Sequence, residues 1–574
     1  MIFMWMSHVY ADNILSPIVV GASVSPIDIH SSPASVDILT SKDIKKSGFR
    51  DVASLLNTIS SISISATGGI GQTTSIFTRG TESNHTKIIL DGVELNPGTL
   101  GLAPIQNIPI HLIDKIEIIK GTSSSLYGAN SIGGIINIIT KKNVDAITLS
   151  TGSWATNSMT LHKALNYNNL NIQLNVNSQE SKSFPTKISS SKKHGYNSND
   201  ILFGIDHYSK NYSFTSKIYT SDGNTQYDSF GSNLNQDHND HFYNVDIKKF
   251  INLNTLNFKY TKTQNKISQA ASDATDFTKT LRNKYDLSYI LINKHFVNKI
   301  GVTYTKEHMS ELSYGTRYIT DPIIRELYYQ EDVFNHDGNV NYGIRFINHS
   351  QFGNFTLGNV GISFKKNKDV YSFNINKAFR APDATDLYGY GGNDKLLPEK
   401  SLSFEFNLKT FLNNNSIFQT SLYKTQIKNL IEADINSVQY IAEAEITGLE
   451  MNYKYITKLL NYKFSYNYMI PKDKTNNQNL SKRSKHKLNV NVAYMFNNNN
   501  SLNLDIISEG TRKATPYYDI DMGSYYVANL NYNFTTINSS VNFSLKNLFN
   551  RKYRNSHNYN TANRSFFITY SYDY

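Results

Sequence analysis

The feature that most constrains this chain is a series of short alternating segments that runs without a linker from about residue 146 to residue 574. Asn, Ser and Asp stand at the breaks between segments, and apolar side chains occupy every second position within them. One such segment carries its apolar side chains at Leu170, Ile172, Leu174 and Val176. A period of two predicts β-strands with one apolar and one polar face.

The lengths of these segments favour a barrel in a membrane. The sequence contains no run of about 18 apolar residues, which excludes a bundle of transmembrane helices. A barrel strand crosses a bilayer with about 9 to 11 residues, of which only every second one is apolar. About 430 residues, at roughly 20 for each strand with its connection, predict a 22-stranded antiparallel transmembrane β-barrel. The alternative from the pattern alone is a soluble sandwich or propeller.

Residues 31–143 have a different character and predict a small α+β domain. Residues 86–90 and 135–139 are Ile-rich runs bounded by Asp-Gly or Gly-Gly, which is typical of strands between tight turns. Residues 41–56 have apolar residues at helical spacing and predict two short helical pieces. A wide barrel leaves a central hole. We therefore expect residues 31–143 to fill, as a plug, a barrel formed by residues 144–574.

The N-terminal residues predict an export signal, followed by a segment that binds a partner protein. Residues 1–11 are apolar and end in Ala11, which resembles a truncated export signal; an ordinary N-terminal strand is the alternative. In the following segment, residues 12–30, a β-branched run behind a proline is able to add a strand to a partner's sheet. That run is Ser16, Pro17, Ile18, Val19, Val20, Gly21 and Ala22.

Composition excludes several classes of function. The absence of Cys excludes disulfides and thiolate metal sites. The net charge is +11, but no basic block with interleaved aromatic residues is present, which argues against nucleic acid as a partner. We find no G-x-S-x-G or H-E-x-x-H motif and therefore expect no enzymatic activity.

Several motifs together resemble one family. They include TRG at residues 78–80, ILDGVELN at 89–96, IDKIEIIKG at 113–121, FRAPD at 379–383 and LKNLFNRKY at 545–553. These segments resemble the TonB-dependent outer-membrane receptors. Within that family, GQTTS at residues 71–75, SNH at 83–85 and LYGYGGN at 387–393 are similar to the cobalamin (vitamin B12) transporters.

The resemblance implies a function and a set of partners. It implies a bacterial outer-membrane protein that imports cobalamin or another corrinoid, energised by TonB and its inner-membrane complex through the run at residues 16–22. Outer-membrane lipids and the barrel assembly machinery, which would recognise the C-terminal strand, are further expected partners, and a monomer is expected. A receptor for a ferric siderophore or haem is the alternative.

The resemblance also implies site residues. Two plug loops are expected to face the ligand, the first plug loop (residues 67–75) and the second plug loop (residues 96–106). Plug cations Arg79 and Lys120 are expected to face wall carboxylates Glu405 and Glu450, because charges inside a barrel are costly unless paired. The implied substrate-binding residues are Thr73, Ser75, Leu100, Gly101, Lys482, Arg512 and Tyr517. No cofactor is expected to be required; calcium in the extracellular loops is the one candidate, on Asp222, Asp228, Asp273 and Asp276.

Overall fold

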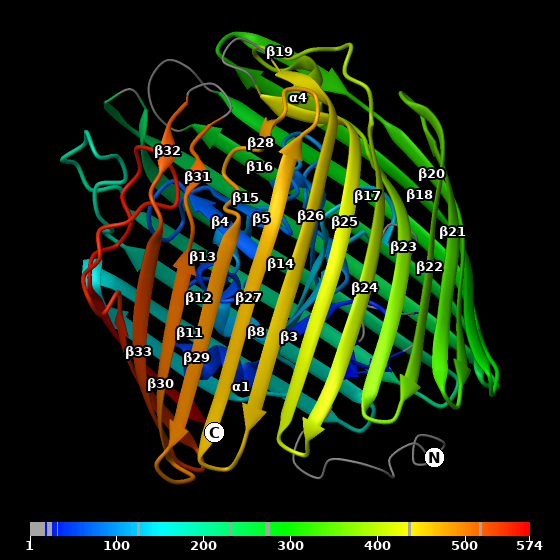
Figure 1. Ribbon diagram of the computed structural model, residues 1–574, viewed down its shortest axis with the longest axis horizontal. Helices are drawn as coiled ribbons and strands as arrows, with labels where there is room; N and C mark the ends of the chain where they lie inside the picture. Colours follow the sequence, from blue (N-terminus) through cyan, green and yellow to red (C-terminus); the bar gives the residue numbers. More distant parts are fainter. Residues whose placement is uncertain are drawn as a thin grey trace.

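The computed structural model places a small N-terminal domain inside a closed β-barrel (Figure 1). The signal-like residues 1–11 lie outside the described residues, as do Ser16, Pro17, Val20, Gly21 and Ala22 of the strand-donating run. The structure describes residues 18–19, 24, 26–30, 32–122, 127–229, 231–269, 276–433, 438–515 and 519–574.

The barrel closes when its first strand pairs with its last. Ala146 of β10 is opposite Asp573 of β35, and the antiparallel register continues to Gly152 and Phe567. Among the described residues the barrel has 22 strands, with β19 and β28 as short additional pairings, so the predicted fold class is confirmed. The strands are β10 (Ala146–Gly152), β11 (Thr156–Tyr167), β12 (Leu170–Ser181), β13 (Tyr196–Tyr208), β14 (Tyr212–Ser229), β15 (Ser232–Ile251), β16 (Asn254–Gln269), β17 (Phe277–Ile292), β18 (Phe296–Ser313), β19 (Thr316–Thr320), β20 (Ile323–Asn335), β21 (Gly338–His349), β22 (Gly353–Lys366), β23 (Asp369–Arg380), β24 (Glu399–Asn413), β25 (Ser416–Ala433), β26 (Val438–Ile456), β27 (Leu460–Asp473), β28 (Gln478–Asn479), β29 (His486–Met495), β30 (Asn500–Glu509), β33 (Tyr525–Thr535), β34 (Ser539–Lys546) and β35 (Ser565–Asp573).

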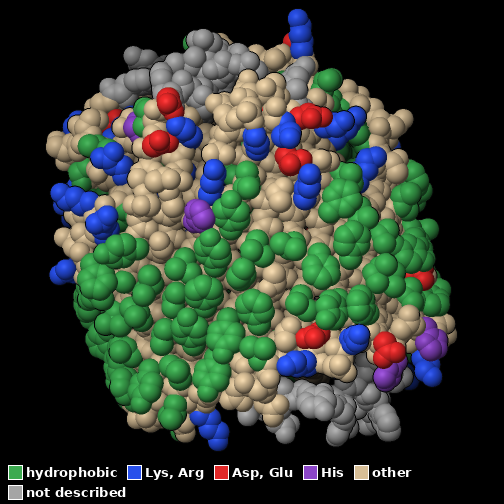
Figure 2. All heavy atoms as spheres, viewed as in Figure 1, with side chains coloured by type: hydrophobic (Ala, Val, Ile, Leu, Met, Phe, Trp, Pro, Cys, Tyr) green, Lys and Arg blue, Asp and Glu red, His purple; other side chains and the backbone are tan. Residues whose placement is uncertain are grey.

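The alternation seen in the sequence becomes two faces of the barrel. Along β21, buried side chains alternate with exposed ones, and the exposed set includes Tyr342, Ile344 and Phe346. Figure 2 shows the consequence on one side of the molecule, where hydrophobic side chains form a broad belt and charged side chains gather beyond its edges. A continuous apolar belt of this kind matches a bilayer.

The two ends of the barrel differ. One end, the short-turn end, carries tight connections such as residues 168–169 after β11 and residues 209–211 after β13. The other, the long-loop end, carries residues 182–195, 381–398 and 547–564. It also holds the small elements η4 (Ser153–Ala155), α4 (Ala384–Tyr388), β31 (Arg512–Lys513) and β32 (Asp521–Met522). Figure 1 shows α4, β19, β31 and β32 together at this end.

The plug is built on a five-stranded sheet with the order β3-β8-β9-β6-β7. The two Ile-rich runs form β6 and β9, which pair in parallel at the centre of the sheet, and the β4–β5 hairpin packs beside it. No helix in the described part of the chain is long and apolar enough to cross a membrane. The plug elements are β3 (Val36–Thr40), α1 (Ser41–Ser47), α2 (Val52–Leu56), β4 (Ile62–Ala66), β5 (Thr74–Thr78), η1 (Ser83–His85), β6 (Thr86–Leu90), β7 (Val93–Glu94), η2 (Ile105–Asn107), η3 (Ile110–Leu112), β8 (Ile113–Lys120) and β9 (Gly134–Thr140).

Local signals set the limits of the plug helices, as predicted for residues 41–56. Thr40 caps α1 in a reciprocal capping box with Asp43, and Gly48 ends the helix with a positive φ of 59°. Asp51 then caps α2 by accepting a hydrogen bond from the Ser54 amide. Both helices contribute to the plug core, which continues into the barrel wall at Tyr219 and Phe242. Shared apolar packing therefore contributes to the position of the plug.

Candidate functional site

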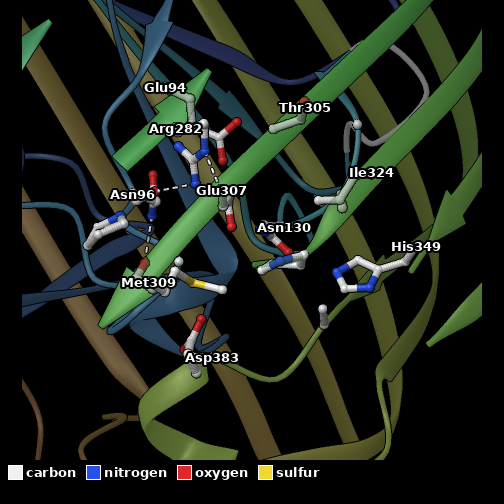
Figure 3. Close-up of a pocket in the computed structure, with 18 of the residues that line it drawn as sticks. Glu94, Asn96, Asn130, Arg282, Thr305, Glu307, Met309, Ile324, His349 and Asp383 are labelled. Carbon is white, nitrogen blue, oxygen red and sulfur yellow. Dashed lines mark hydrogen bonds and ion pairs between the residues drawn. The ribbon is translucent and has the colours of Figure 1, made fainter. Parts of the chain in front are cut away.

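A pocket at the long-loop end lies between the second plug loop and the barrel wall (Figure 3). Asn96, Gly98 and Gly101 line it from the plug. Met309 and His349 line it from the wall. On the plug side, two glycines leave the backbone open to a ligand, and on the barrel side the wall is partly polar and partly apolar.

Most charged residues around this pocket are paired. The Arg282 guanidinium donates to the carbonyl oxygen of Asn96 at 2.9 Å and also pairs with Glu307, and Figure 3 shows it between these two residues. On the plug, Lys87 and Glu94 form an ion pair at 3.1 Å. Burial lowers the pKa of Lys87 to about 8. Burial would raise the pKa of Glu94, but Lys87 and Arg282 bring it down to about 2.

The described charged residues that line the pocket are nearly balanced. They comprise the cations Lys87, Arg282 and Lys284 and the carboxylates Glu94, Glu307, Glu326 and Asp383. The lining therefore offers no excess of positive charge to a multiply charged anion. A bulky ligand of low net charge suits such a wall better.

A second polar network ties the plug to the base of this pocket. His85, which is fully buried, donates from Nε2 to Glu399 at 2.9 Å, and its Nδ1 accepts from the Glu82 amide. Arg380 binds the same Glu399 and pairs with Asp383 at 2.7 Å. Both ring nitrogens of His85 are thus occupied, so His85 is not positioned as an axial ligand for haem iron.

The predicted plug and wall charges meet on the barrel wall around Arg79. Its guanidinium binds Glu405 and Glu450, each at 2.7 Å, and stacks on the Tyr423 ring at 4.5 Å. Lys120 binds the other oxygen of Glu450 at 2.6 Å. All four charged groups are at least nine-tenths buried. The structure therefore brings Arg79, Lys120, Glu405 and Glu450 into one cluster.

Backbone conformation holds Arg79 in this position. Its φ is +50°, a left-handed value that is unfavourable for a residue with a side chain. The Arg79 amide donates to the Ser61 carbonyl at 2.7 Å, which fixes the turn. Burial alone would lower the pKa of Arg79, but Glu405 and Glu450 raise it, so the guanidinium stays charged.

Comparison with known proteins assigns the architecture. Residues 28–135 match the family description "TonB-dependent Receptor Plug Domain", and residues 153–548 match "TonB dependent receptor-like, beta-barrel". The second match alone covers more than half of the chain. The chain belongs to the TonB-dependent receptors. It is therefore a bacterial outer-membrane protein, and the family implies interaction with TonB and a transported substrate rather than an enzymatic reaction.

Individual relatives differ in the substrates that their names give. The vitamin B12 transporter BtuB of Photobacterium profundum is 26% identical over 94% of this chain and 93% of its own length. The siderophore receptor PirA from Acinetobacter baumannii is 18% identical, with a TM-score of 0.81 over 94% of this chain and 98% of its own. A variant of the ferric enterobactin receptor PfeA from Pseudomonas aeruginosa is 16% identical, with a TM-score of 0.81 over 95% of this chain and 100% of its own. The two structural likenesses establish the fold.

The predicted substrate-binding residues of this receptor occupy different environments. Gly101 lines the pocket with a φ of +63°, and an added Cβ there would lie 2.4 Å from an Asp383 oxygen. Leu100, beside it in the second plug loop, is half-buried, as is Ser75 in β5. Thr73 and Lys482 are exposed at the long-loop end.

Two further predicted ligand residues need separate comment. Arg512 is only 5% exposed; its guanidinium donates to the Arg554 carbonyl at 2.9 Å and stacks on Tyr525 at 5.6 Å. Its visible role is thus to hold loop residues 547–564 against the wall. Tyr517 lies outside the described residues.

Sequence reasoning missed most of the pocket. Arg282, Glu307 and Glu326 each stand at an inward position of a strand, where no local motif distinguishes them from other wall residues. Arg380 and Asp383 belong to the FRAPD segment, which the sequence singled out without a role. Asp383 accepts a hydrogen bond from plug residue Asn84, and Arg380 binds Glu399, the same carboxylate that plug residue His85 contacts. These relations become visible only in three dimensions.

The aspartates expected to hold calcium are spread apart. We expected Asp222 and Asp228 in an extracellular loop, but both lie in the continuous strand β14, where six residues span about 20 Å. Asp228 pairs with Lys187 at 3.2 Å. Asp276 accepts from the Tyr314 amide at 3.2 Å. Asp273 lies outside the described residues, within which no group of three or more His, Asp or Glu side chains is arranged to hold a metal ion.

Acidification is expected to loosen the plug of this receptor. Burial raises the pKa of Asp37, Asp91 and Glu94, but a lysine facing each one outweighs burial, so each pKa lies below its ordinary value. A lowered carboxylate pKa adds stability above the ordinary value, about 4, and that stability disappears as pH falls through the lowered value.

Calorimetry of the detergent-folded receptor tests this expectation. The unfolding temperature of the plug should fall between pH 5 and pH 2, with the loss from Glu94 centred near its pKa of about 2. A Glu94→Gln variant should show a shallower fall across the same range. An unfolding temperature that does not change with pH in this range would contradict the assignment.

Proposed function

We propose that this receptor imports cobalamin or a related corrinoid across the outer membrane, with energy delivered by TonB. The observation that carries the substrate assignment is the charge balance of the pocket at the long-loop end. A corrinoid is bulky, rich in amides and low in net charge. Its site therefore needs protein backbone that the ligand can approach closely, together with scattered polar groups that bond its amides. A ferric catecholate is a multiply charged anion and would favour a surplus of cations.

Two further observations support the same assignment. The vitamin B12 transporter of Photobacterium profundum is a relative over 94% of this chain. His85 is fully buried and bonded through both ring nitrogens, so it is not positioned to bind haem iron. We further propose that the receptor acts as a monomer and that the barrel assembly machinery recognises its C-terminal strand, β35.

Energy coupling follows from the architecture. A barrel closed by a packed plug does not leak, and the outer membrane offers no ATP. The energy must therefore arrive from the inner membrane through a mechanical link. The backbone of Ile18 and Val19 already adopts strand conformation, paired with Ile27 and Asp28. A strand of this kind can be extended by a periplasmic partner through main-chain hydrogen bonds.

Equilibrium binding tests the proposal. The purified receptor, folded in detergent, is titrated with cyanocobalamin, a ferric catecholate siderophore and haem, each with and without calcium. Saturable binding of cyanocobalamin alone supports the proposal, and a tighter affinity with calcium would show that calcium contributes to the binding site. Binding of the siderophore or haem without cyanocobalamin would overturn the substrate assignment.

Gly101→Ala is expected to weaken cobalamin binding by roughly tenfold, which corresponds to a loss of about 1.4 kcal/mol of binding free energy. The added Cβ would meet the Asp383 carboxylate at 2.4 Å and disturb the wall of the pocket. Gly315→Ala is the matched control, since Gly315 also has a positive φ, of 80°, but an added Cβ there meets nothing within 4 Å. Equal affinities for the two variants would place the ligand away from Gly101.

A further inference from the structure

A cavity lined mainly by positive charge opens at the short-turn end of the receptor. It holds about 630 Å³ and lies between helix α1 of the plug and strands β30, β33, β34 and β35. The short connections after β26, β29 and β33 border its mouth. Figure 1 shows α1 near the end of the barrel where the C-terminus lies. Outer-membrane barrels turn their short connections toward the periplasm, so this lysine cavity faces the periplasm.

Five lysines line the cavity without a matching number of carboxylates. They come from α1, from the residue directly after β9 and from the connection after β26, and are Lys42, Lys45, Lys46, Lys141 and Lys458. Asp573 is the one carboxylate among the described lining residues. Asp43 of α1 pairs instead with Lys463 of β27, at 3.1 Å. Within the described part of the chain, no carboxylate lies within ion-pair distance of any of the five lysines.

Two of these lysines carry their charge in unfavourable surroundings. Burial and the nearby Lys42 lower the pKa of Lys46 to about 8, and burial and Lys45 lower the pKa of Lys141 to about 8. Among the described residues, the Lys46 ammonium makes one weak hydrogen bond, to the Met495 sulfur at 3.5 Å. An opposite charge a few ångströms away would favour the charged form of both lysines. The cavity is therefore electrostatically suited to an anionic ligand.

Elsewhere the interface between plug and barrel is neutralised by local pairs. Lys217 of β14 binds plug residue Asp91 at 2.5 Å, and plug residue Arg79 binds Glu405 of β24 at 2.7 Å. Pairing of this kind is expected inside a barrel, because a buried charge without a partner is costly. The lysine cavity departs from this pattern, so its complement must come from outside the described residues.

The remaining lining residues indicate which kind of anion fits. Asn533 and Asn542 line the cavity with side-chain amides, and Ile44, Phe49 and Ile113 line it with apolar side chains. The lysines come from three separate segments of the chain, so they offer several cationic contacts. An acidic peptide supplies several carboxylates, main-chain amides and apolar side chains together. A small anion would use only part of this lining.

We propose that the lysine cavity docks an acidic segment of a periplasmic protein. This docking is separate from strand addition at residues 18–19, because the segment that follows them is held elsewhere on the wall. The Val24 amide donates to Asp332 of β20 at 2.7 Å, and Lys409 of β24 donates to the Ile29 carbonyl at 2.7 Å. The inference rests on the outer-membrane location of the receptor and does not depend on which solute it imports.

Fluorescence anisotropy with the purified, detergent-folded receptor tests the proposal. The probe is a labelled synthetic peptide in which pairs of glutamates alternate with single leucines, and its control peptide has glutamine in place of every glutamate. The acidic peptide should bind saturably, and the glutamine peptide should not bind. In the variant Lys45→Gln with Lys141→Gln, the affinity should fall by roughly tenfold, because two contacts between a cation and a carboxylate are lost.

A second pair of lysines provides the matched control. Lys210 and Lys294 are exposed in short connections at the same end of the barrel, outside the cavity. Lys210→Gln with Lys294→Gln therefore removes the same amount of charge and should keep the affinity within about twofold of the wild type. An equal loss in both variants would show general attraction to a basic surface and would overturn the proposal. Absence of acidic-peptide binding by the wild type would overturn it as well.

A protection experiment on the unaltered receptor removes any dependence on the folding of the variants. Lysines are acetylated with a limiting amount of reagent, with and without the acidic peptide, and mass spectrometry measures the modification at each site. The peptide should protect Lys45 and Lys141 severalfold and leave Lys210 and Lys294 unchanged. Equal protection of all four lysines, or protection of none, would contradict docking in the cavity.

Inorganic phosphate distinguishes a small anion from an acidic protein segment. Phosphate at the concentration of the peptide should neither protect Lys45 and Lys141 nor displace the labelled peptide. Equal protection by phosphate would assign the cavity to a small anion and overturn the protein partner. None of these measurements uses cyanocobalamin, so failure of the docking site and failure of the proposed substrate are distinguishable.

Discussion

Deletion of residues 18–21 is expected to abolish energised uptake while leaving ligand binding at the long-loop end intact. The deletion removes the segment that would join a TonB strand, at the opposite end of the plug from the pocket. About four main-chain hydrogen bonds, each contributing about 1 kcal/mol, would be lost, which weakens that association by roughly a thousandfold. Uptake and binding of labelled cyanocobalamin by the same cells are the two measurements. A simultaneous loss of binding would contradict this separation of roles.

A pair of point variants isolates the role of the backbone. Val19 is paired antiparallel with Ile27 in the short β1 (Ile18–Val19) and β2 (Ile27–Asp28) ladder. Val19→Pro removes a main-chain donor and disfavours strand pairing, so it should abolish uptake. Val19→Thr keeps the donor and the β-branched shape, so it should retain uptake. Equal uptake by the two variants would mean that TonB recognises the side chains of this segment and not its main-chain hydrogen bonds.

Glu450→Gln is expected to loosen the plug more than any other single change on the wall. Glu450 binds Arg79 at 2.7 Å and Lys120 at 2.6 Å and is fully buried. Removing one partner of a buried ion pair typically costs about 3–5 kcal/mol. In Glu450→Gln, Arg79 would keep only Glu405 and Lys120 would keep only Asp37, which lies 3.0 Å away. Limited proteolysis should therefore cut the plug much faster, and cells should become sensitive to large antibiotics that the closed barrel excludes.

The control for this variant comes from the same strand. Glu443 is also in β26, but its side chain is 59% exposed and lies 4.0 Å from Lys428. Exposed pairs contribute little, so Glu443→Gln should resemble the wild type. Wild-type protease resistance in Glu450→Gln would show that apolar packing alone holds the plug.

The strands of this receptor were predictable because their signal is local. Each barrel strand needs only alternate apolar residues facing lipid and a turn at each end, and the sequence carries both within about 20 residues. The Ile-rich runs that became β6 and β9 were equally plain, since a buried central strand is apolar on both faces. The misreading of Asp222 and Asp228 has the same origin, because polar residues in a strand above the lipid belt resemble a turn.

The sequence by itself thus determined the barrel, the plug and, through resemblance, the cluster of four charges formed by Arg79, Lys120, Glu405 and Glu450. Tertiary structure alone decided how the plug is rotated inside the wall. That rotation brings His85 to Glu399, Asn96 to Arg282 and Phe49 to Lys546, pairs separated by up to several hundred residues. Such contacts depend on barrel shear and on the fit of two surfaces, which no local pattern encodes. The pocket at the long-loop end arises from that fit.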